Sequence, residues 1–211
     1  MTSDPAVTPT PTPPPDPTGP PPAACAVAFK EWAGVCAGLL AGRRSLILRK
    51  GGVAEAGGTF RPEHPAFWLY PTVVHEAEQG LRPTAAGPDP IPAFDPARSV
   101  PIAALAVVEW AGRVETLEQL AALEPLHDWT EATIRGRFDY RRPGLWALAV
   151  RVYRRAEPYP LAVTPEQVGC KTWVPLDPPI PLDGAAPVLD AAESAARLDA
   201  LRRALAGGGL S

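Results

Sequence analysis

Histidine is the side chain best suited to moving protons near neutral pH, and this sequence contains only three: His64, His75 and His127. We predict His75 and His127 as candidate general bases. His75 falls in the first turn of an expected helix, where the positive end of the helix dipole favours neutral imidazole. Each histidine can equally be a structural residue held by hydrogen bonds. No cluster of His, Cys and Asp has the spacing of zinc ligands, so we predict no metal site.

A second group of candidate residues lies in the segment 46–64, LILRKGGVAEAGGTFRPEH. An expected strand carries two cations to its end, and two glycine pairs follow. Glycine lets backbone N–H groups approach an anion closely, and basic side chains supply the counter-charge. We predict that Lys50 stabilises charge beside the histidine base, and that the ligand contacts Arg49, Gly51, Gly52, Arg61 and His64. The GxxxxGK[ST] phosphate loop is absent, and a glycine pair after a strand is also an ordinary turn.

A third candidate region is the segment 127–142, HDWTEATIRGRFDYRR, in which basic and aromatic residues alternate. Residues 135–155 contain seven Arg and one Asp. Cations beside aromatic rings can follow a phosphate backbone and stack on bases. We therefore predict ligand contacts at Trp129, Arg135, Arg137 and Arg151. The alternative is a solvated arginine face, because the chain uses Arg far more than Lys throughout.

Composition sets limits on these hypotheses. The chain has 211 residues, 29 of them Pro, and its formal net charge of −3 argues against bulk attraction to nucleic acid or membrane. Three widely spaced Cys with no CxxC pair exclude a disulfide scaffold and favour reduced thiols, so we predict a cytoplasmic protein. We see no secretory signal, and the longest apolar run, residues 102–108, is too short for a membrane helix.

The two ends of the chain differ in composition from its body. Residues 1–24 form a Thr/Pro tract that we predict to be a disordered tail. Residues 25–180 are expected to form one domain, and residues 181–211 a linker and an amphipathic helix ending at Gly207. The sequence does not show whether that helix packs on the body.

The helices and strands that must position these residues can be predicted from the spacing of apolar side chains and from residues that begin or end such elements. Residues 29–39 carry apolar side chains at helical spacing, and helices are also expected at 72–80, 117–123 and 131–138. Strands are expected at 43–50, 67–70, 102–110, 145–154 and 171–176. Two capping boxes, Thr116-x-x-Gln119 and Asp128-x-x-Glu131, mark helix starts, and Pro71 is expected to end its strand. Because the order lacks a strict βαβ rhythm, we predict a compact α+β domain with a small mixed sheet flanked by helices.

Several segments in order resemble a known family. They are AFKEWAGVCAGLLAGRRSLILRKGG, FRPEHPAFWLYPTVVHE, HDWTEATIRGRFDY, RVYR and GCKTWVPL. This pattern resembles the prokaryotic family catalogued as domain of unknown function 1802, over roughly residues 27–178. The resemblance implies no activity, ligand or cofactor. It does place Tyr70, Thr72 and Lys171 on motif positions at strand ends, where polar residues are good candidates for ligand contact.

We therefore predict one cleft lined by His, Arg and Lys side chains that binds a phosphate-bearing anion, a nucleotide or nucleic acid. The alternative is an enzyme acting on a phosphate ester or nucleotide, with His75 or His127 as general base. A third possibility is an interaction protein that uses its Pro-rich tail. The identity of a cofactor, the oligomeric state and the ligand itself do not follow from the sequence.

Overall fold

The computed structural model describes residues 20–50, 62–73, 80–82, 91–169 and 171–207, and its centre is one mixed β-sheet. The strands are β1 (Ala24–Trp32), β2 (Leu46–Arg49), β3 (Ala66–Thr72), β4 (Ser99–Val114), β5 (Leu145–Ala162), β6 (Trp173–Pro181) and β7 (Ala186–Pro187). Their order is β2-β5-β4-β3-β1-β6, with β7 paired to β5. β1 and β3 run parallel and the other pairs are antiparallel. The predicted α+β class with a mixed sheet and flanking helices is confirmed.

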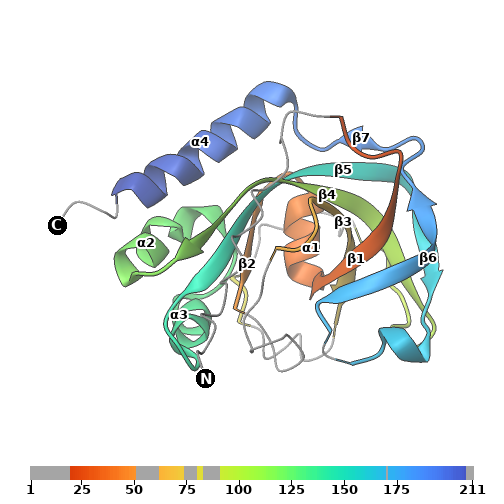
Figure 1. The fold of residues 1–211 in the computed structure, drawn as a ribbon, viewed down its shortest axis with the longest axis horizontal. Coiled ribbons are helices and arrows are strands. Elements are labelled where there is room, and N and C mark those ends of the chain that lie inside the picture. Colours follow the sequence, from red (N-terminus) through yellow and green to blue (C-terminus); the bar gives the residue numbers. More distant parts are fainter. Residues whose placement is uncertain (1–19, 51–61, 74–79, 83–90, 170, 208–211) are drawn as a thin grey trace, which may run out of the picture.

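The sheet curves strongly, so that β1 and β6 come round toward the face carried by β4 and β5 (Figure 1). Two hydrophobic clusters fill its two sides. One contains Phe29, Phe67 and Leu148 and packs against the helices, and the other contains Trp68, Leu105 and Tyr153. Consecutive residues of β3 alternate between the clusters, as expected for a strand that is buried on both faces. Phe67 and Trp68, for example, belong to different clusters.

The first helix is shorter than its apolar spacing predicts. Residues up to Trp32 belong to β1, and α1 covers only Ala33–Leu40. α1 lies within the curve of the sheet, against β1, β3 and β5 (Figure 1). Gly42 follows it with φ +67°, the left-handed conformation in which glycine commonly ends a helix. The helical spacing of Phe29 and Trp32 arises because one points into the core from a strand and the other lies at its end.

Two further helices follow the long β4 strand and are fixed by side-chain caps. The Thr116 capping box is confirmed: it opens α2 (Leu117–Ala122) with both reciprocal hydrogen bonds. The second predicted box is wrong, because Thr130 and not Asp128 caps α3 (Glu131–Asp139) through a bond from the Thr133 amide. Asp128 instead pairs with Arg44 of the loop before β2, at 2.8 Å. The Asp128 carboxylate therefore forms a long-range ion pair instead of the helix cap that its local spacing predicts.

The remaining strands extend beyond the predicted ranges. β3 continues through Pro71, which pairs in register with Glu31 at the end of the strand. Pro71 therefore does not stop the strand, contrary to our prediction. β5 and β6 also run on past residues 154 and 176. Thr72, the first residue of the predicted helix at 72–80, belongs to β3 instead. Residues 74–79 and most of the Pro-rich tail lie outside the described residues.

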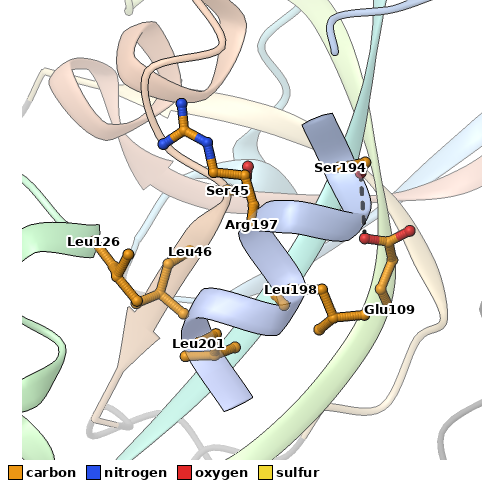
Figure 2. A pocket seen from close by; sticks show the side chains of 9 residues that line it. Ser45, Leu46, Glu109, Leu126, Ser194, Arg197, Leu198 and Leu201 are labelled. Atoms are coloured by element: carbon orange, nitrogen blue, oxygen red, sulfur yellow. Dashed lines mark hydrogen bonds between the residues drawn. The ribbon is translucent and has the colours of Figure 1, made fainter. Parts of the chain in front are cut away.

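The C-terminal helix α4 (Ala191–Gly207) packs on the body of the domain. It crosses the outer side of β4 and β5 next to α2 (Figure 1). Leu201, 3% exposed, points with Leu198 toward Leu46 and Leu126, and Ser194 donates to Glu109 at 3.4 Å (Figure 2). These residues line a small cavity under the helix. None of the described helices combines the length and apolarity needed to span a membrane.

Candidate ligand-binding site

The site begins with a buried carboxylate near the end of β1. Glu31 is 2% exposed, and its Oε1 accepts a hydrogen bond from the Trp32 backbone amide at 2.7 Å. Its Oε2 has no hydrogen-bond partner among the described residues and lies 3.9 Å from Arg49 Nη1. Burial raises the pKa of the Glu31 carboxyl, while Arg49 and the Trp32 amide oppose that rise. Oε2 of Glu31 is thus a buried hydrogen-bond acceptor without a donor, and it lies beside the Arg49 cation.

Arg49 joins the two edges of the curved sheet at this point. It leaves the end of β2, and its Nη2 donates to Thr172 Oγ1, directly before β6, at 2.9 Å. Its guanidinium also lies over the Phe29 ring, 5.0 Å from the ring centroid. β2 and β6 are the terminal strands of the sheet order. The site therefore lies where side chains bridge the two edge strands.

Arg137 brings the second guanidinium from α3. Its Cζ lies 4.4 Å from the ring centroid of Trp32 and 4.7 Å from that of Trp129. The two indoles contact each other at 4.1 Å with an interplanar angle of 46°. Burial lowers the pKa of Arg137 and the Glu31 carboxylate opposes this change, so the group stays cationic at neutral pH. The Arg137 guanidinium makes no hydrogen bond with any part of the chain that the structure describes.

Aromatic rings continue from the site toward His64. Phe29 contacts Trp173 edge-on at 4.9 Å, and Trp173 contacts the half-buried His64 ring at 4.8 Å. His64 is therefore linked through two rings to the Arg49 guanidinium. We call Glu31, Arg49, Arg137, Trp32 and Trp129 the Glu31–Arg137 site, with His64 at its rim. Its hydrogen-bonding capacity combines unused donors on Arg137 with one unused acceptor on Glu31.

Lys50 does not join this site, although Arg49 directly precedes it. Its Nζ donates to the backbone oxygens of Phe138 at 2.8 Å and Gly144 at 2.7 Å, and also to that of Arg142. These carbonyls follow the C-terminal end of α3, so the ammonium holds that turn together. Partial burial and Arg113 lower the pKa of Lys50, and Asp139 opposes them. These contacts hold Lys50 at the end of α3, and its role in stabilising charge in the cleft stays a prediction.

His127, which we predicted as a candidate base, is buried beside α3. It is 3% exposed, and its Nδ1 accepts a hydrogen bond from the Trp129 amide at 3.2 Å. Its surroundings include Arg82, which donates to the His127 carbonyl, and Arg44. Burial and these two cations lower the pKa of His127 to about 4. An imidazole with so low a pKa is a weak proton acceptor at neutral pH.

The other predicted contacts are distributed over the molecule. Tyr70 belongs to the opposite hydrophobic cluster, where Lys30 lies over its ring, and Thr72 donates to the Glu31 carbonyl at 3.2 Å. Lys171 is exposed and bonds the Glu166 carbonyl. Arg151 pairs with Glu109 at 3.4 Å beneath α4, and Arg135 is exposed on α3, two residues from Arg137. Arg151 is thus engaged by a carboxylate, whereas Arg135 is open to solvent. Gly51, Gly52, Arg61 and His75 lie outside the described residues.

Sequence reasoning missed the carboxylate that organises the site. Glu31 and Trp32 lie on motif positions of the family resemblance, but both were read as part of a helix, so neither was assigned a chemical role. A signal was available in the composition: Lys30-Glu31-Trp32 places a charged pair inside an otherwise apolar stretch. Thr172 was also missed. Among the described residues, no three His, Cys, Asp or Glu side chains gather in a way that could hold a metal ion.

Comparison with protein families assigns this chain to one of them. The model of the domain of unknown function DUF1802 matches residues 28–200. The chain belongs to the DUF1802 family. The matched region includes the whole Glu31–Arg137 site and extends into α4, further than the resemblance found in the sequence. The family description gives no activity for a DUF1802 domain. No curated protein matches this chain.

Solved structures offer a loose similarity only. The crystal structure of ASCH from Zymomonas mobilis has 11% identity and a TM-score of 0.40, covering 82% of this chain and 93% of that chain. A mutant of the same protein has 13% identity and a TM-score of 0.41, covering 83% of this chain and 94% of that chain. Scores this low describe a partial likeness of chain path, and nothing about function follows from them.

Proposed function

We propose that this DUF1802 chain is a binding module for a phosphate-bearing anion, a nucleotide or a nucleic acid strand, held at the Glu31–Arg137 site. The observation that carries this proposal is the Arg137 guanidinium, which lies against the contacting indoles of Trp32 and Trp129 and makes no hydrogen bond to the described residues. A guanidinium fork matches two phosphate oxygens, and such charge-assisted bonds are about twice as strong as neutral ones. Arg49 adds a second cation, with its Nη1 3.9 Å from Glu31 Oε2.

The rings around the cations support a ligand that has a flat part. Trp32 is half-buried and Trp129 is buried, and both rings contact the Arg137 guanidinium. The contacting rings of His64 and Trp173 add to the aromatic surroundings of the site. A base stacked on an aromatic or guanidinium face gains about 1–3 kcal/mol. A nucleotide offers both a phosphate and a base, so it uses the two kinds of group that the site contains.

An enzyme acting on a phosphate ester is the second candidate, and one observation favours it. The pKa of Glu31 is raised by burial, as is typical of carboxyl groups that transfer protons. Glu31 then takes the place of His127 as the general base. Release of inorganic phosphate from nucleoside monophosphates separates the candidates. Turnover that disappears in Glu31→Gln supports an enzyme, and tight binding without turnover supports a binding module.

Calorimetric titration of the full chain with adenosine and cytidine monophosphates tests the binding proposal. Arg137→Gln removes the charge and the fork, and we expect affinity to fall about tenfold or more, the usual effect of losing a bond to a charged group. Arg203→Gln is the control, because it removes one positive charge from the exposed side of α4. Equal affinities for the wild type and both variants, or no binding of any nucleotide, would overturn the proposal.

Salt dependence distinguishes a single nucleotide from a strand. Binding of an extended strand releases counterions from several phosphates, so the logarithm of affinity falls steeply with the logarithm of salt concentration. A short single-stranded RNA should show a steeper slope than a monophosphate if the site continues along a strand. Equal slopes would indicate that a single nucleotide fills the site.

A further inference from the structure

We propose that the ligand is a single nucleic acid strand and that the turn after α3 binds its next nucleotide, with the base against Tyr140 and the phosphate against Arg141 and Arg142. This inference rests on the proposed function and deepens it, because it commits the Glu31–Arg137 site to a strand. Its basis is an exposed aromatic ring beside exposed arginines, on a turn that the fold holds in a strained conformation.

The exposed ring lies next to the Glu31–Arg137 site along α3. Tyr140 is 50% exposed, and Arg141 Cζ lies 5.1 Å from the centroid of its ring. The Tyr140 amide donates to the Arg137 carbonyl at 3.3 Å. Residues three apart at a helix end are neighbours on its surface, with Cβ atoms about 5–6 Å apart. A strand that places one phosphate at Arg137 can therefore bring its next base to Tyr140, and bases stack on such rings whatever their sequence.

The conformation of this turn indicates that its arginine has a use. Arg141 has φ +62°, the left-handed conformation, which no other non-glycine residue adopts in the described part of the chain. An arginine is less stable there than glycine, because its Cβ crowds the carbonyl oxygen, and such strain gathers at functional sites. Lys50 fixes the turn by donating to the carbonyls of Phe138, Arg142 and Gly144. Since Lys50 bonds these carbonyls, the arginines are not needed to cap the helix.

The charge of the turn complements a phosphate backbone. Arg141 and Arg142 are exposed, and neither forms an ion pair with a carboxylate of the described residues. Asp139 is the one acidic residue between positions 137 and 142. Tyr140 is the only exposed large hydrophobic residue of the fully described segment 131–142, which is too little apolar surface for a membrane. A ring among cations is the combination that binds single-stranded nucleic acid.

Calorimetric titration of the full chain with 5′-phosphorylated oligoadenylates of increasing length tests this inference. We expect a tetranucleotide to bind about 5- to 150-fold more tightly than adenosine monophosphate, the range for stacking one further base. Tyr140→Ala should remove this gain, and Tyr140→Phe should keep it because the ring remains. Val168→Ala is the matched control, since Val168 is also an exposed hydrophobic residue but does not lie on this turn. A gain that survives in Tyr140→Ala refutes the base contact.

Arg141→Gly supplies the second arm, because glycine relieves the positive φ while the charge is removed. We expect its thermal midpoint to stay the same or rise, while tetranucleotide affinity falls about tenfold and the salt slope decreases by about one. Lost folding cannot produce this combination. Equal affinities for monophosphate and tetranucleotide, with Arg137→Gln weakening both, refute the strand and leave the binding function standing. Equally tight binding of an oligoglutamate of the same charge also refutes the strand, and no binding of any nucleotide refutes both proposals.

Discussion

Replacing His127 by Asn should change how the stability of the domain depends on pH. His127 has a pKa of about 4 in the folded chain, against 6.5 for a free imidazole. A group with a lowered folded pKa binds its proton more readily in the unfolded state. Unfolding is therefore favoured as the pH falls below about 6.5, and the effect is complete below about 4.

The size of this effect follows from the two pKa values. Linkage gives a loss of about 2 kcal/mol between pH 7 and pH 5, and about 3 kcal/mol at still lower pH. Solvent screens this loss of stability little, because the imidazole is 3% exposed. Asn does not titrate, and its Oδ1 can accept the Trp129 amide bond that His127 Nδ1 accepts at 3.2 Å.

Urea unfolding at pH 7, 6 and 5, followed by tryptophan fluorescence, measures the effect. Both proteins contain the same carboxyl groups and the same other histidines, so the difference between their profiles isolates His127. We expect the His127→Asn variant to lose about 2 kcal/mol less than the wild type over this range. Parallel profiles would contradict the buried, neutral imidazole and would reopen its role as a base.

Two other substitutions test parts of the fold. Lys50→Met removes three hydrogen bonds to backbone carbonyls at the end of α3, and we expect it to lower the free energy of unfolding by about 1–2 kcal/mol in urea. Lys171→Met is the control, because Lys171 is exposed and makes one such bond. It should change the free energy of unfolding by less than about 0.5 kcal/mol. Nucleotide affinity should be unchanged in Lys50→Met, and a loss of affinity at full stability would return Lys50 to the site. Leu201→Ala opens a cavity under α4 and should cost about 2–5 kcal/mol; a change below about 0.5 kcal/mol would show that α4 does not pack on the body.

The parts of the fold that depend on local chemistry were predictable from the sequence. The Thr116 capping box needs only two side chains three residues apart, and both of its bonds form. β4 and β5 were predictable because each contains a long apolar run. Phe29 and Trp32 were misassigned because their spacing fits a helix as well as the end of a strand. Periodicity over four residues cannot separate these two structures.

The candidate site was predictable only in part, because it is assembled by long-range contacts. Arg49, Trp129 and Arg137 were all named from composition, and the structure brings them together with Glu31. Arg49 and Lys50 were expected in the same cleft, but consecutive residues at a strand end point to different sides. Lys50 accordingly meets α3, and Arg49 meets Glu31. Asp128 likewise pairs with Arg44, which is far away in the sequence, and does not form its predicted helix cap.

The location of the ligand is tested most directly by the indole N–H signals of the six tryptophans. In a two-dimensional 1H–15N NMR titration with adenosine monophosphate, assigned through single Trp→Phe variants, we expect the Trp32 and Trp129 signals to move together. Trp146, which lies beside Arg113, serves as the internal reference and should not move. Shifts confined to Trp146 or Trp110, with Trp32 and Trp129 unchanged at saturation, would show that the ligand binds elsewhere.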